Sequence, residues 1–155
     1  KAGNISPNPV TLAPTSTQGG CLRRLAGDFN DSITSFGNMF NIRVSLRTDV
    51  VINTLDFHTD ITSDVSYQVF VINGGFEHGV SSLDHWKLVS AGTVVGAGKG
   101  YATSIPPQSF EPVTILSGLT MGFLVNLSSD NMHFTETMTP VGQQVGGDNF
   151  ITMEA

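Results

Sequence analysis

The sequence has few charged side chains and a single cysteine. Charged residues make up 13% of its 155 residues, about half the share that is typical of a globular domain. Because Cys21 stands alone, an intramolecular disulfide and a zinc site built from several cysteines are both excluded. The polar surface must therefore come from Ser, Thr, Asn, Gln and Gly, which favours an extracellular β protein or a repeating assembly over a cytosolic enzyme.

Basic residues and long apolar runs are also scarce. Seven Lys and Arg stand against thirteen Asp and Glu, giving a net charge of −6 and a pI near 4.9. Nucleic-acid-binding proteins normally carry a basic stripe on their surface. No apolar run in the sequence approaches the roughly 20 residues of a membrane-spanning helix. We therefore expect neither a nucleic-acid partner nor a membrane span.

The chain divides by composition into a short arm and one domain. Residues 1–20 are rich in Pro, Ser, Thr, Asn and Gly, which predicts an extended arm or linker before a single domain over 21–155. The arm has one apolar patch, at Val10 and Leu12, which could add as a strand to a sheet edge of its own chain or of a neighbour. Residues 21–37 fit either a short helical turn or an irregular segment.

From Asn38 onward the sequence follows a period of two, as a half-buried strand does. In the stretch MFNIRVSLR, apolar residues from Phe40 to Leu46 alternate with polar ones. The pattern predicts that the apolar side chains, including Phe40 and Leu46, face the core and that the polar ones face away from it. About eight short strands follow from this pattern, separated by Gly, Asn, Asp and Pro: 39–47, 49–57, 64–72, 86–98, 112–118, 120–128, 132–138 and 149–153. The predicted fold is all-β, an antiparallel β-sandwich or jelly roll.

An acidic stretch with a histidine, LDFHTD, lies between two of these strands. On an extended backbone Asp56, His58 and Asp60 project from one side and could bind a divalent cation such as Ca²⁺. Leu55 and Phe57 occupy the opposite side, which identifies the acidic side as the solvated one. We therefore interpret the stretch as a polar turn, and expect no resident cofactor; a metal site is the alternative.

The loop GGFEHGVSSLDHW gathers aromatic side chains beside carboxylates. Phe76 and Trp86, with Tyr101 from a later loop, could stack on the apolar faces of a sugar ring. The other interpretation is that Trp86 begins a strand and anchors the core. Farther on, GAGKG fails the spacing of a phosphate-binding loop, so its glycines predict a bulge or a tight bend between strands.

Three Asn-x-Ser sequences, at Asn4, Asn30 and Asn126, are acceptors for N-linked glycans if the chain is secreted. No catalytic serine elbow and no His-Glu-x-x-His zinc motif occurs. We therefore do not expect an enzyme.

Spaced hydrophobic signatures from Phe40 to Ile151 carry a resemblance: FNIRVSLRTDVVINTLDFHT, VSYQVFVINGGFEHG, HWKLVSAGTVVGAGKG, SIPPQSFEPVTILSGLTMGFLVNL and VGGDNFI. In these the chain resembles an uncharacterised β-sandwich module of predicted secreted and cell-surface proteins of diatoms and related algae. The stretch VFVINGG departs from the Val-Tyr-Thr-Lys stretch that is usual there. The resemblance implies an extracellular structural, adhesive or recognition module, and carries over no active site.

Three functions follow from the sequence, in order of preference. The first is a structural or adhesive module at the cell surface or in a filament. It would assemble with copies of itself or with other matrix and surface proteins, through strand addition by the arm at Val10 and Leu12. The second is a carbohydrate-binding module using Phe76, Trp86 and Tyr101. The third is a metal-assisted enzyme using Asp56, His58 and Asp60.

Overall fold

The computed structural model describes residues 10–13, 23–25, 33–134 and 144–154. Nearly all of this part is antiparallel β-structure, and its helices are three short 3₁₀ turns. The all-β, antiparallel prediction is confirmed. No helix in the described ranges is long and apolar enough to cross a membrane.

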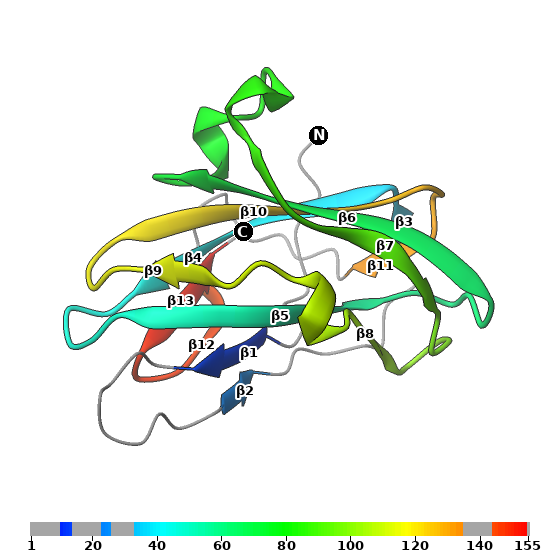
Figure 1. The fold of residues 1–155 in the computed structure, drawn as a ribbon, viewed down its shortest axis with the longest axis horizontal. Helices are drawn as coiled ribbons and strands as arrows, with labels where there is room; N and C mark the ends of the chain where they lie inside the picture. Colours follow the sequence, from blue (N-terminus) through cyan, green and yellow to red (C-terminus); the bar gives the residue numbers. More distant parts are fainter. Residues whose placement is uncertain (1–9, 14–22, 26–32, 135–143, 155) are drawn as a thin grey trace.

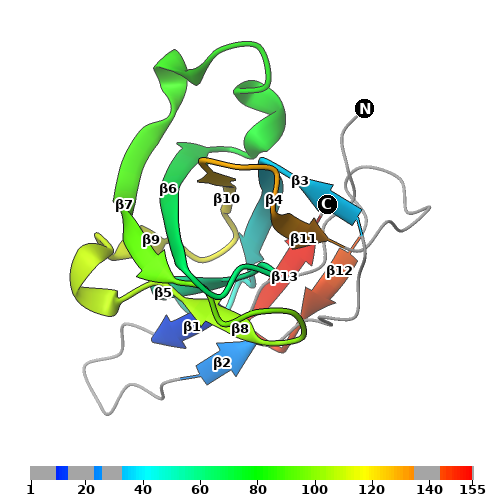
Figure 2. The same cartoon turned by 90° about the vertical axis from the view of Figure 1, so that its right-hand side faces the viewer.

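Two main sheets face each other around the core (Figures 1 and 2). The larger has the order β12-β13-β4-β10-β6-β7. Its strands are β4 (Gly37–Val44), β6 (Asp64–Asn73), β7 (Lys87–Val95), β10 (Thr120–Leu127), β12 (Gln144–Gly147) and β13 (Ile151–Glu154).

The smaller main sheet is assembled around one long strand, β5 (Val50–His58). Its order is β2-β1-β5-β8, and β9 also pairs with β5. The partners are β1 (Val10–Ala13), β2 (Arg23–Leu25), β8 (Ala102–Ser104) and β9 (Val113–Ile115). A separate pair, β3 (Ile33–Ser35) with β11 (Met132–Phe134), lies beside the end of β5, where Met132 forms a bridge to Thr59.

The alternation in the sequence correctly predicted which side chains enter the core from the larger sheet. On β6, Val65, Tyr67, Val69 and Val71 are buried, whereas Asp64, Ser66 and Gln68 are exposed. At the centre, Phe40 of β4 and Phe123 of β10 stand opposite each other, and their rings stack at 5.5 Å with an interplanar angle of 11°.

The predicted inward position of Leu46 is wrong. Strand β4 ends at Val44, and the side chain of Leu46 is 88% exposed in the turn that follows. Backbone bonds fix this turn, because Val44 N–H donates to Leu119 O (2.9 Å) and Gly118 N–H donates to Val44 O (3.1 Å). The chain therefore turns away before the next apolar residue can reach the core.

The N-terminal segments also add strands. Arg23–Leu25 forms β2, so the helical-turn alternative for this part of 21–37 is wrong. Of the two alternatives for the arm, the structure has the one within its own chain, since β1 pairs with β5 through Val10 opposite Leu55 and Leu12 opposite Ile52.

Truncation of the stacked ring at the centre should test this core. We expect Phe40→Ala to lower the free energy of unfolding by about 3–5 kcal/mol, because it removes a buried ring and leaves a cavity against Phe123. Phe36→Ala is the matched control, since that ring is exposed and its loss should cost under about 0.5 kcal/mol. Chemical denaturation measures both values, and equal losses would contradict this description of the core.

Candidate functional site

The acidic stretch is not a solvated turn. Strand β5 continues to His58, and both Asp56 and His58 are buried. The prediction failed because it assumed that one face of β5 is wet. In the structure β8 pairs with this end of the strand, and β11 lies alongside it, with His133 packed against His58.

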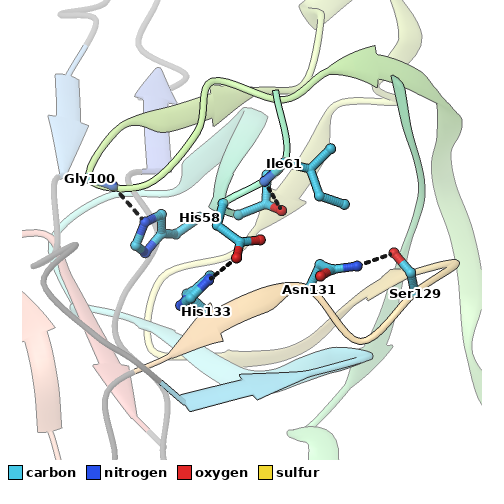
Figure 3. A network of polar contacts seen from close by, with 8 residues as sticks. His58, Ile61, Gly100, Ser129, Asn131 and His133 are labelled. Atoms are coloured by element: carbon cyan, nitrogen blue, oxygen red, sulfur yellow. Dashed lines mark hydrogen bonds and ion pairs between the residues drawn. The ribbon is translucent and has the colours of Figure 1, made fainter. Parts of the chain in front are cut away.

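Two buried imidazoles form the centre of this polar cluster (Figure 3). The rings of His58 and His133 lie 4.9 Å apart, tilted by 36°. Gly100 N–H donates to His58 Nε2 at 2.9 Å, so this nitrogen carries no proton in this arrangement. On the far side, His133 Nε2 lies 3.6 Å from Oδ2 of the half-exposed Asp60.

The cluster provides few ligands for a metal ion. Among the residues that the structure describes, no group of three or more His, Cys, Asp or Glu side chains is placed to hold one. Strand β5 ends at His58, and Asp60 lies beyond it at the solvent, so the predicted row of Asp56, His58 and Asp60 is not continuous. What the geometry shows is a hydrogen bond that ties the turn before β8 to the end of β5.

Removing this acceptor should loosen the end of β5. We expect His58→Leu to lower the free energy of unfolding by about 1–3 kcal/mol, because the N–H of Gly100 loses its partner. His85→Leu is the control, since that imidazole is exposed, and its effect should be within about 0.5 kcal/mol. Denaturant unfolding of the two variants compares them, and an unchanged stability of His58→Leu would contradict the assigned bond.

The aromatic loop builds a second, smaller core. Its short turns are η1 (Phe76–His78) and η2 (Leu83–His85), and the loop projects from the sandwich at the top of Figures 1 and 2. Phe76 and Trp86 are buried against Ile72, with Phe70, Met39 and Leu124 of the outer sheet face packed around them. Trp86 is 8% exposed, and its Nε1 donates to Gly79 O at 3.0 Å.

The three predicted sugar-binding aromatics do not form one surface. Phe76 and Trp86 lie beside the Asn73 end of β6, where β7 begins. Tyr101, 69% exposed, follows the turn that bonds to Ile61 just before the other end of β6. The ten residues of β6 separate the two places, about 30 Å by strand rise.

A methyl group at Gly79 should displace the tryptophan. A Cβ there would lie 2.1 Å from Trp86 Nε1, so we expect Gly79→Ala to move the indole toward solvent and to shift its emission to longer wavelength. The backbone of Gly79 has a negative φ, so strain is not the cause. Ser81→Ala in the same loop should leave the spectrum unchanged. Because Trp86 is the single tryptophan, fluorescence reports it directly, and an unshifted spectrum would contradict the packing.

The glycine-rich stretch forms a tight bend, as the sequence predicted. Gly98 and Gly100 both have φ near +83°, which residues with a side chain rarely adopt. Gly98 N–H donates to Ile61 O (3.1 Å), and Tyr101 N–H donates to Gly98 O (3.2 Å).

Of the predicted glycan acceptors, the structure describes Asn126. It lies half-buried on the outer face of β10, between Gln68 of β6 and Gly37 of β4. Asn4, Asn30 and Cys21 lie outside the described residues, as do the side chains of Val10 and Leu12, whose backbone alone is placed.

Strand β7 has a feature that the sequence analysis missed. It is an edge of the larger sheet, at the left margin of Figure 2. Within the described residues the backbone on its side away from β6 is bonded at one place, by the bridge Ser90–Phe110 and the bond from Glu111 N–H to Val89 O, and β8 lies close to the strand without pairing with it. Residues 91–95, AGTVV, continue beyond it without a charge, a proline or a further strand partner. The uncharged β-branched run after Lys87 was the signal available in the sequence.

Exposed leucines gather at one end of the sandwich, which we call the leucine end. Leu46 lies in the turn between β4 and β5, and Leu116 and Leu119 flank the turn between β9 and β10, both at the left of Figure 1. A hollow of about 350 Å³ opens there, lined by Asn73, Gly74, Thr114, Ile115, Leu116, Leu119, Thr120 and Met121. The alternation pattern missed this surface because it placed Leu46 in the core.

No family model, curated protein or solved structure matches the chain. The class that the structure defines is thus an all-β domain of antiparallel sheets, and the resemblance to the algal module stays a prediction.

Proposed function

We propose that this chain is an extracellular structural or adhesive module that associates with copies of itself. The open edge of β7 over residues 91–95 carries the proposal. An edge strand presents unpaired backbone N–H and C=O groups, and proteins that remain monomeric usually protect it with charges, proline or a covering segment. In the part of the chain that the structure describes, no strand besides β6 pairs with residues 91–95, which follow the Ser90–Phe110 bridge.

The side chains at this edge favour pairing. Ala91, Gly92, Thr93 and Val95 are exposed, and Val95 is 67% exposed. Two copies of the segment can pair antiparallel about a two-fold axis, since each then provides the same surface to the other. The segment itself carries no charge, so its own side chains do not repel those of the second copy.

The N-terminal arm supports assembly less directly than the β7 edge does. Because β1 already pairs with β5 of its own chain, joining copies through the arm would require two chains to exchange β1. The β7 edge needs no exchange. The carbohydrate-binding alternative has no observation in its favour, because Phe76 and Trp86 are buried and Tyr101 lies far from them.

The extracellular assignment is supported by composition. Charge is low and the exposed polar residues are mainly hydroxyl and amide side chains, as on Ser66, Gln68 and Thr93. Because such a surface carries few charges, the repulsion between neighbouring copies comes mainly from the overall net charge of the chain.

Charges placed on the β7 edge should dissociate the assembly. We expect the full chain to form oligomers whose size increases with concentration, and the double variant Thr93→Lys/Val95→Lys to weaken that contact at least roughly tenfold, because two copies would bring four lysines together. Sedimentation velocity over a concentration series measures the change.

The control adds the same two charges elsewhere. Val80→Lys/Ser81→Lys changes two exposed residues of the aromatic loop, outside the β7 edge, and it should assemble like the parent chain. Equal weakening in both double variants would show a general charge effect and overturn the proposal. A parent chain that stays monomeric at all concentrations would overturn it as well.

A further inference from the structure

The leucine end has a projecting side chain and an apolar hollow side by side. Leu46 projects from its turn, and a Cβ at position 118 would meet Leu46 Cδ2 at 2.7 Å. Glycine at that position, with φ +77°, therefore lets Leu46 lie against the neighbouring turn. Gly118 N–H also bonds to Val44 O and to Ser45 O at 3.1 and 3.2 Å, so the two turns hold each other in place.

The hollow beside this projection is apolar at its wall and floor. Leu116 and Leu119 stand exposed at its rim, while Ile115 is buried in the core below. Its volume of about 350 Å³ is ample for one branched aliphatic side chain. Leu116 and Leu119 line the hollow, and Leu46 lies against the turn that joins them. Exposed leucines gathered in this way form an apolar patch, and such a patch marks an interaction site.

We propose that the leucine end binds the same end of a second copy, with Leu46 of each copy entering the hollow of the other. A two-fold contact requires a surface that is complementary to itself, and a projection next to a matching hollow meets that requirement. This inference rests on the self-association proposed above and adds a second contact to it.

Charges at this end fit a second copy better than a lipid surface. Arg47 is exposed, and two residues later Asp49 accepts a hydrogen bond from Ser117 N–H at 2.8 Å, so the carboxylate is fixed in position. A two-fold contact can bring Arg47 of one copy against this carboxylate of the other. A bilayer offers no such pairing for the carboxylate of a chain that is already acidic.

The two contacts lie at different places on the fold. Asn73, at one end of β6, lines the hollow, whereas Val95 of the β7 edge pairs with Asp64 at the other end. One two-fold contact yields a closed dimer, whereas two separate ones join each copy to two neighbours and generate an assembly larger than a dimer. The partner at the leucine end is therefore the second neighbouring copy in that assembly.

Four versions of the full chain separate the two contacts: the parent, Leu46→Ser, Thr93→Lys/Val95→Lys, and the combination. We expect the parent to grow beyond dimers, each interface variant to stop at the dimer, and the combination to be monomeric in sedimentation velocity. Leu46→Ser should weaken the leucine-end contact roughly tenfold or more, because two leucines leave the interface together.

Leu83→Ser is the matched control, since Leu83 is 58% exposed in the aromatic loop, and it should assemble like the parent. Thermal unfolding should show the same midpoint for Leu46→Ser and the parent, because Leu46 contributes little to the core. If the parent and Leu46→Ser both stop at the dimer while the lysine variant is monomeric, the leucine-end contact is overturned and the β7 edge is untouched. If the parent and the lysine variant both stop at the dimer while Leu46→Ser is monomeric, the β7 edge fails and the leucine end stands. A monomeric parent overturns both.

Discussion

The smaller main sheet depends on β5, because β1, β8 and β9 all pair with it and β2 joins the sheet through β1. On one side it pairs with β1, and on the other with β9 at its beginning and β8 at its end. Those partners are three or four residues long and too short to hold a sheet by themselves. Leu55 and Phe57 on one face are fully buried, and Asp56 and His58 on the other are buried as well. Strands β1, β8 and β9 are therefore held in place by their pairing with β5, and β5 is itself fixed because both of its faces are buried.

The sequence predicted which side chains are buried more accurately for the larger sheet than for the smaller one. Alternation on β4 and β6 identified Phe40, Ile42, Val65 and Val69 as core residues, because polar residues occupy the positions between them, such as Arg43 on β4 and Ser66 and Gln68 on β6. The same rule misplaced Asp56 and His58, since a strand buried on both faces does not alternate. It also misplaced Leu46, where the bonds between Val44 and the 116–119 turn end the strand early. Contacts with residues far along the chain decided both cases.

The candidate surfaces were less predictable still. One of the two interpretations of the loop placed Trp86 in the core, and its burial bears this out, whereas the burial of Phe76 beside it was not expected. The β7 edge and the leucine end follow from strand order and from which turns share an end of the sandwich. Neither relation can be read from local composition, because each joins segments that are distant in sequence.

The pairing of β13 with β4 has a consequence for how the chain acquires its structure. Val44 pairs with Ile151 of β13, and β4 meets β10 on its other side, so both neighbours of β4 are synthesised long after it. During synthesis, β4 and β5 therefore leave the ribosome long before the strands that cover them. Contacts of such long range are formed slowly, so the newly made chain passes through a period in which its apolar strands are uncovered.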